Sequence, residues 1–273
     1  MTSMVHLICA LNCEAEPLRA YYRLKQDTES GLFKTYSNPD ARITLTVSGT
    51  GKINAAAATS YTHEYYHALK SDAWLNIGIA GHQSLDIGQA VLAHKIIDIS
   101  SNTTWYPQII FSTPCPSSTL KTLDKPSSEY EEHLFDMEAA GFFAIASRVT
   151  TCEIVHVLKI ISDNKSYPAS KLDKAVVLGL IANQIDTIDS IIDSLQQLSR
   201  ELAAVFSPPR EYHACLEHWH FTWYERRTLL YLLTRWQVLF PGTSILKRIG
   251  NISDGRQFIQ LVQEKLDNTP ILY

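Results

Sequence analysis

The length, composition and charge of this chain indicate a globular protein with one large domain and at most a small addition. It has 273 residues, of which 45% are hydrophobic and 10% aromatic, and such a chain can bury a sizeable core. Its formal net charge of −4 gives no overall attraction to nucleic acid or to an anionic membrane. We therefore expect a small molecule or a protein as the partner, and we do not expect nucleic acid.

The first residues carry no recognisable targeting signal. No Lys or Arg precedes the apolar run at residues 5–11, so no signal peptide is expected. No stretch of about 18 uncharged apolar residues occurs, and therefore no membrane-spanning helix is expected either. The five cysteines are scattered, without a Cys-x-x-Cys pair, which is typical of a reducing compartment. These features predict a cytoplasmic protein.

Apolar runs and turn signals alternate along the first 205 residues. Strands are predicted at residues 5–11, 32–37, 42–48, 73–80, 89–99, 119–123 and 153–161. Helices are predicted at residues 17–24, 55–69 and 137–149, with one long or two joined helices within 172–205. Residues 100–118 are rich in proline and are expected to be irregular. This alternation indicates an α/β fold around one central sheet.

The end of the chain is predicted to form a helical extension, with domains at 1–206 and 207–273. Pro208 and Pro209 end the preceding helix, and the Thr222-x-x-Glu225 capping box predicts a helix over 223–239, followed by another near 254–266. This tail is only slightly basic, which argues weakly for nucleic-acid contact. A group of His and Cys residues invites a zinc interpretation, but its spacing matches no standard finger, so packing is preferred and no metal is predicted. The group is His213, Cys215, His218 and His220.

Acidic side chains follow two of the predicted strands and precede one helix. Glu14 and Glu16 follow the first strand, and Asp163 follows the strand that ends near residue 161. Ligands of open α/β sheets bind at such strand ends, so one of the two glutamates, and Asp163, are candidates for acid or base chemistry. Glu138 precedes an apolar helix, where its carboxylate could accept hydrogen bonds from two sugar hydroxyls. Solvated first-turn residues and an Asx turn or N-cap remain open as alternatives.

A glycine turn joins the third predicted strand to the second helix. The stretch Ser48-Gly49-Thr50-Gly51-Lys52 could cradle an anion or a ligand at the helix N-terminus, or could simply form a tight turn. It is not a Walker A loop, because Thr46 replaces the first glycine and Ile53 follows the lysine.

Five short pieces in this order resemble the nucleoside phosphorylase/nucleosidase superfamily, most closely its methylthioadenosine/S-adenosylhomocysteine nucleosidases. The resemblance covers about residues 4–200 and implies a three-layer α/β/α sandwich with a central mixed sheet, no cofactor, and a homodimer or larger homo-oligomer. The pieces are Ala10-Leu11-x-x-Glu14-Ala15, Ser48-Gly49-Thr50-Gly51-Lys52-Ile53-Asn54-Ala55-Ala56, Asn76-x-Gly78-x-Ala80-Gly81, Asp136-Met137-Glu138-Ala139-Ala140 and Ile161-Ser162-Asp163.

The resemblance assigns roles to individual residues. It implies that Glu14 activates the attacking water and that Asp163 protonates the leaving purine. Glu138 would bind the ribose hydroxyls, Met137 would pack against the ribose and Gly81 would line the substrate site. Further substrate contacts are expected from Thr50, Ile79 and Ser162.

The chain departs from the family where an aromatic residue normally stacks on the base. A Ser-Gly-Asp-x-aromatic stretch is replaced here by Thr122-Leu123-Asp124-Lys125-Pro126-Ser127. Asp124 and Ser127 remain candidate contacts to the base. Stacking is then weaker, or it comes from elsewhere, the candidates being Phe111, Trp105 and Tyr106.

The predicted function is hydrolysis of the N-ribosyl bond of an adenosine-type purine nucleoside, with or without a 5′ modification as in methylthioadenosine and adenosylhomocysteine. Among the matched loops only Lys52 is cationic, which favours hydrolysis, because a phosphorylase holds its dianion best with arginine. Arg19, Arg42 or a neighbouring subunit could still supply that arginine. A phosphate-dependent phosphorylase and a non-catalytic nucleoside-binding module are the alternatives, and the role of residues 208–273 stays open.

Overall fold

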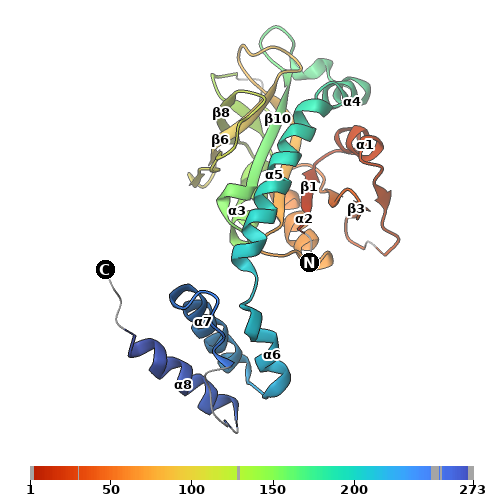
Figure 1. Cartoon of the computed structure of the whole chain (residues 1–273). Helices are drawn as coiled ribbons and strands as arrows, with labels where there is room; N and C mark the ends of the chain where they lie inside the picture. The colour runs from red at the N-terminus through yellow and green to blue at the C-terminus, as the bar shows by residue number, and fades with distance from the viewer. Residues whose placement is uncertain (1–2, 30, 128–129, 247–251, 253, 270–273) are drawn as a thin grey trace. The chain divides into compact units, whose positions relative to one another are not determined.

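The protein is described by a computed structural model that covers residues 3–29, 31–127, 130–246, 252 and 254–269 (Figure 1). The chain divides into two compact units, Met1–Val205 and Phe206–Tyr273. Among the described residues, no single helix has the length and apolar composition to cross a membrane, and the bent pair of helices Lys174–Ala182 and Ile185–Phe206 would meet that test only together.

A mixed sheet forms the centre of the first unit, as the sequence predicted. Its strands are β1 Val5–Cys9, β2 Lys25–Gln26, β3 Lys34–Asn38, β4 Ile43–Val47, β5 Ala73–Gly81, β6 Ala90–Asp98, β7 Thr104–Trp105, β8 Ser117–Thr122, β9 Leu134–Asp136 and β10 Val155–Asp163. The strand order is β10-β6-β8-β9-β5-β1-β4-β3-β2. Because β10 also pairs with β5, the strands β5, β10, β6, β8 and β9 form a closed ring, from which the remaining strands extend.

Parallel pairing brings several strand ends to one edge of this sheet. β1 lies between β4 and β5 and is parallel to both, while β10 is parallel to β5. The residues that follow β1, β4, β5 and β10 therefore emerge side by side. All nine residues of β10 are buried, which explains its nearly continuous apolar sequence.

Helices cover both faces of the sheet. The helices are α1 Asn12–Tyr21, α2 Lys52–Tyr65, α3 Ala139–Val149, α4 Lys174–Ala182 and α5 Ile185–Phe206. Alternate residues of β1 and β5 belong to two core clusters, one shared with α1, α4 and α5 and the other with α2 and α3. The long helix α5 runs along the sheet in Figure 1. α2 and α3 pack so closely that a Cβ on Gly141 would lie 1.9 Å from the backbone oxygen of Lys52, so glycine is required there.

The helix boundaries agree with the sequence except at one important place. α1 begins at Asn12 rather than near residue 17, so Glu14 lies inside its first turn and Pro17 within the helix. The reason is that the carboxylate of Glu14 accepts hydrogen bonds from the backbone of Ala10 and Leu11 and thereby fixes the start of the helix.

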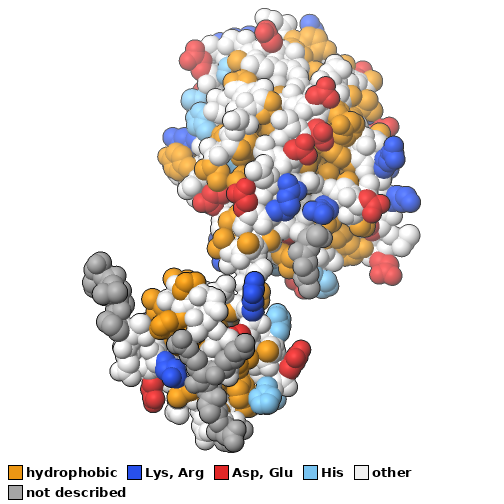
Figure 2. Space-filling model, viewed as in Figure 1, with side chains coloured by type: hydrophobic (Ala, Val, Ile, Leu, Met, Phe, Trp, Pro, Cys, Tyr) orange, Lys and Arg blue, Asp and Glu red, His pale blue; other side chains and the backbone are white. Residues whose placement is uncertain are grey.

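The second unit consists of α6 Arg210–His218, α7 Trp223–Leu239 and α8 Gly255–Asp267. α7 has the predicted bounds and capping box, whereas α6 was not predicted. Cys215 of α6 is buried in an apolar core with Phe221, Trp236 and Phe258. Apolar side chains appear on the visible face of this unit in Figure 2, and Trp223, Tyr224 and Val238 of α7 are each at least 70% exposed.

Candidate active site

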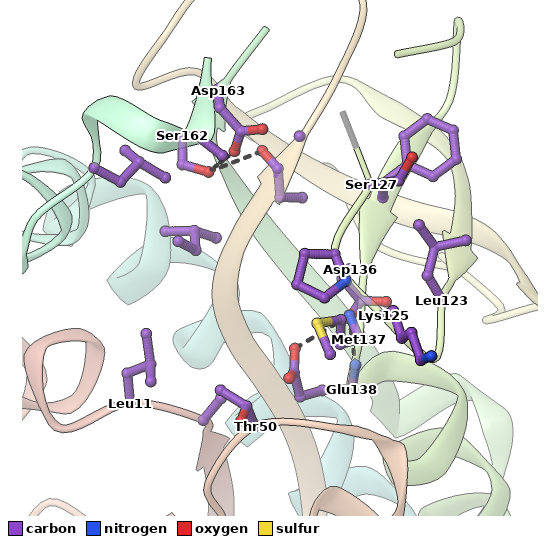
Figure 3. A pocket seen from close by; sticks show the side chains of 18 of the residues that line it. Leu11, Thr50, Leu123, Lys125, Ser127, Asp136, Met137, Glu138, Ser162 and Asp163 are labelled. Carbon is purple, nitrogen blue, oxygen red and sulfur yellow. Dashed lines mark hydrogen bonds between the residues drawn. The ribbon is translucent and has the colours of Figure 1, made fainter. Parts of the chain in front are cut away.

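A cavity of about 210 Å³ opens where the strand ends of the first unit meet. Nine of the ten predicted site residues line it: Glu14, Thr50, Ile79, Gly81, Ser127, Met137, Glu138, Ser162 and Asp163. Glu138 and Met137 lie on one side of the cavity, and Ser162 and Asp163 lie on the other (Figure 3). We call the part around Glu14 and Glu138 the glutamate end and the part around Asp163 the aspartate end.

Glu14 is held at the glutamate end by backbone groups alone. Its Oε2 accepts hydrogen bonds from the N–H groups of Ala10 at 2.9 Å and Leu11 at 2.8 Å, and its Oε1 accepts one from Ile79 at 3.1 Å. Burial raises the pKa of Glu14 to about 6, although the charge of Lys159 and the backbone hydrogen bonds oppose this rise. At pH 7 the carboxylate is therefore mainly ionised, as a base must be.

Glu138 is the second buried carboxylate of the glutamate end. It precedes α3, and its Oε1 accepts a hydrogen bond of 2.7 Å from the N–H of Gly51 in the glycine turn after β4. Gly51 has φ = +96°, a conformation that residues with a Cβ rarely adopt. Burial raises the pKa of Glu138, and Lys159 again opposes the rise. The glycine turn thus orients the carboxylate of Glu138 through the N–H of Gly51.

A buried ion pair that the sequence did not suggest lies behind both glutamates. The Nζ of Lys159 is 2.9 Å from Oδ2 of Asp136, and both side chains are at most 1% exposed. Asp136 also accepts hydrogen bonds from the Thr122 hydroxyl at 2.7 Å and the Ala139 N–H at 2.8 Å. The signal in the sequence was one lysine within the apolar run of β10, where a charge is stable only if it is paired.

Asp163 is held differently, by two hydroxyl groups. The Ser162 hydroxyl donates to its Oδ1 at 2.5 Å, and the Tyr130 hydroxyl donates to its Oδ2 at 2.8 Å. Burial and the hydrogen bond to Asp163 raise the pKa of Tyr130, so the phenol stays protonated and can donate. A Cβ on Gly81 would lie 2.8 Å from the same Oδ2, so the contact requires glycine at this position. Sequence reasoning missed Tyr130, because it lies in a long irregular stretch without periodicity.

The three aromatic residues named as candidates for stacking on the base lie outside the cavity. Trp105 packs against Phe143, Phe111 meets His156 edge to face, and Tyr106 is 61% exposed. None of these three lines the cavity. Within the described part of the chain, the aromatic residues that do line it are Tyr130 and Phe135.

Asp124 is the one predicted site residue that does not line the cavity. Its carboxylate lies 2.7 Å from the Nζ of Lys52, which also pairs with Asp98 at 2.8 Å. Because Lys52 is held by these two carboxylates, it is not available as a site for phosphate. Among the described residues that line the cavity, the cationic side chain is Lys125, and none is arginine.

The two arginines that could have supplied a phosphate site also lie elsewhere. Arg19 stacks over the ring of Tyr36 at 4.0 Å, and Arg42 belongs to the turn before β4. Neither lines the cavity.

No protein-family model and no curated protein matches the sequence. Solved structures do match the fold. The apo 5′-methylthioadenosine nucleosidase of Arabidopsis thaliana gives a TM-score of 0.61 at 19% identity, covering 71% of this chain and 96% of that one. The Helicobacter pylori 5′-methylthioadenosine/S-adenosylhomocysteine nucleosidase with butyl-thio-DADMe-Immucillin-A gives a TM-score of 0.56 at 15% identity, covering 71% of this chain and 99% of that one.

The Neisseria meningitidis 5′-methylthioadenosine/S-adenosylhomocysteine nucleosidase in complex with methylthio-immucillin-A gives 0.54 at 21% identity, covering 70% of this chain and 99% of that one. These matches bear out the resemblance first drawn from five short motifs. Over about 71% of its length, the chain has the fold of the methylthioadenosine/S-adenosylhomocysteine nucleosidases.

Proposed function

We propose that this protein hydrolyses the N-ribosyl bond of an adenosine-type purine nucleoside. One observation carries the proposal: Glu14, Glu138 and Asp163 come from three separate segments of the chain, yet they line one cavity. A site that only bound a nucleoside would not need a base at one end and an acid at the other. The proposal includes the finer architecture, a three-layer α/β/α sandwich with residues 207–273 as a helical extension, and a homodimer or larger homo-oligomer.

The glutamate end supplies the attack on the sugar. Cleavage of an N-ribosyl bond passes through an oxocarbenium-like ribose, as glycoside hydrolysis does, and requires a base that activates water. Glu14 has this role, since it is ionised at neutral pH yet shielded from bulk solvent. Glu138 accepts hydrogen bonds from the ribose hydroxyls, and Met137 beside it packs against the sugar.

The aspartate end supplies the proton for the leaving group. A purine anion leaves poorly, and general acid help of this kind contributes about 10²–10⁴-fold in rate. Asp163 donates this proton to the purine. Ser162 and Tyr130 fix both of its oxygens and so orient the carboxyl group towards the base.

Water rather than phosphate is the proposed acceptor of the ribosyl group. A phosphorylase has to bind a dianion, for which the forked guanidinium of arginine is best suited. Lys125 is the cation among the described lining residues, and Lys52 is held by Asp98 and Asp124. An adenosine-type substrate, with or without a 5′ modification, follows from the fold neighbours, whose bound molecules include butyl-thio-DADMe-Immucillin-A, methylthio-immucillin-A and adenine.

An assay for the release of free base tests the proposal. The protein is incubated with a panel of nucleosides, with and without phosphate, and the free base is detected by chromatography. The panel should contain adenosine, inosine, methylthioadenosine, adenosylhomocysteine and 5′-deoxyadenosine. We expect base release without phosphate, and its loss in Glu14→Gln. Glu16→Gln makes the same change on an exposed residue of the same helix and should leave the rate unchanged. Release only with phosphate would make the protein a phosphorylase, and binding without release would leave a nucleoside-binding module.

A further inference from the structure

The ammonium of Lys159 is a buried charged group of the first unit that the proposed chemistry does not use. It lies in the middle of β10, is 1% exposed and is not among the residues that line the cavity. Burying a charge in this way is unfavourable unless it is paired. Its direct partner is Asp136, at 2.9 Å.

The surroundings of Lys159 are more acidic than one ion pair requires. Burial disfavours the ammonium, but the carboxylates of Asp136, Glu138 and Glu14 outweigh this effect and raise the pKa of Lys159. The interaction is mutual, because Lys159 is the largest influence that lowers the pKa of Glu14 and of Glu138.

Gly78 of β5 shows how close the groups are. A Cβ on Gly78 would lie 3.0 Å from Oε1 of Glu14 and 3.3 Å from Nζ of Lys159. The carboxylate of Glu14 and the ammonium therefore flank the same narrow space beside β5. This space stays open because residue 78 has no side chain.

We propose that Lys159 is a positioning residue of the glutamate end that does not contact the substrate. It anchors Asp136 and supplies the positive charge that offsets the negative charges of Glu14 and Glu138 together. The proposal rests on the proposed function, because it assigns Lys159 a part in the same reaction. In a purely structural role, Lys159 would only neutralise Asp136 and would not affect the glutamates. Asp136 accepts hydrogen bonds from the backbone N–H groups of Glu138 and Ala139 at the start of α3.

The groups that can titrate around Glu14 are few. Lys159 faces it from β10, Glu138 from the start of α3, Cys9 from β1 and Cys13 from α1 itself. Burial raises the pKa of both thiols, so they remain neutral at and below pH 7. The acidic limb of the pH profile of kcat/KM therefore reports on the glutamates and on the charge beside them.

The test compares this acidic limb in the wild type, Lys159→Met and Lys159→Arg. Removal of the ammonium should move the limb to higher pH, because the glutamates then protonate more readily. A shift of one pH unit would lower kcat/KM about tenfold on that limb. Lys159→Arg keeps the charge and should restore the wild-type position. Lys95→Met removes a lysine from β6 outside the cavity and should leave the limb in place.

The double variant Lys159→Met with Asp136→Asn guards against misfolding, because it removes both charges of the buried ion pair and leaves no unpaired charge at Asp136. Asp136 raises the pKa of Glu138, so its replacement by Asn partly offsets the loss of Lys159, and the limb should move upward by less than in Lys159→Met alone. A limb that stays at its wild-type position in both variants, or unfolding of both in thermal melts, would overturn the proposal for Lys159 alone. A folded wild type that releases no base from any nucleoside would instead overturn the proposed function, and this assignment with it.

Discussion

The two ends of the cavity hold their carboxyl groups in different ways. At the glutamate end, Glu14 and Glu138 accept hydrogen bonds from the backbone N–H groups of Ala10, Leu11, Ile79 and Gly51. At the aspartate end, both oxygens of Asp163 are held by side-chain hydroxyls. Backbone donors are fixed by the course of the strands, whereas side-chain donors can be exchanged by single substitutions.

This difference indicates how readily single substitutions can change the geometry of each end of the cavity. The glutamate end is tied to the sheet, so its geometry is a property of the fold. Tyr130 of the aspartate end comes from the stretch between β8 and β9, whose side chains Lys125, Pro126 and Ser127 also line the cavity and are exposed. We therefore expect substitutions at the aspartate end to change which base this protein accepts.

The largest expected effect is the loss of the acid. Asp163→Asn should lower kcat for base release by about 10²–10⁴-fold, because the purine then leaves without a proton. Asp40→Asn, the same change in an exposed turn, is the control and should have no effect. Measurement of kcat with the best substrate of the panel decides this, and a loss of less than about tenfold would mean that another group protonates the base.

The next effect is the dependence of activity on pH at the glutamate end. The pKa of Glu14 is raised to about 6, and its active form is the ionised one. Activity should therefore be full above this value and fall about tenfold for each pH unit below it. A profile of kcat/KM between pH 4.5 and 8 measures this. A limb near pH 4.5, the ordinary value for a glutamate, would show that burial does not raise the pKa of the base.

A smaller effect is expected from the hydroxyl of Tyr130. Tyr130→Phe keeps the ring but removes the donor to Asp163, and a typical hydrogen bond contributes about 0.5–1.5 kcal/mol. We expect kcat to fall about tenfold with little change in KM. Tyr167→Phe, on a residue that does not line the cavity, is the matched control. Equal rates for Tyr130→Phe and the wild type would show that Ser162 alone suffices to hold the acid.

The same division explains how much of the site the sequence could reveal. Local patterns located the strand ends and the helix start, and the family resemblance then singled out Glu14, Glu138 and Asp163 at these places. Lys159 and Tyr130 were missed because their roles depend on partners more than 20 residues away, Asp136 and Asp163, and no local pattern encodes such pairs. Asp124 was assigned by its place beside a family motif, but its partner Lys52 became apparent only once the chain was folded.

The smallest expected effect is that of replacing Gly51. It distinguishes backbone strain, which lowers stability, from a weaker hydrogen bond to Glu138, which raises KM. Gly51 and Gly242 have φ values of +96° and +75°, and a Cβ at either would meet no atom within 4 Å. Alanine should therefore cost each unit about 1–3 kcal/mol of stability through strain alone. Alanine keeps the backbone N–H, but the strain at residue 51 should displace this N–H from Glu138, so only Gly51→Ala should weaken the hold on the ribose and raise KM about fivefold. Thermal unfolding and KM measured on both variants test this prediction. If Gly242→Ala raised KM as much as Gly51→Ala, the increase could not be attributed to the hydrogen bond between Gly51 and Glu138.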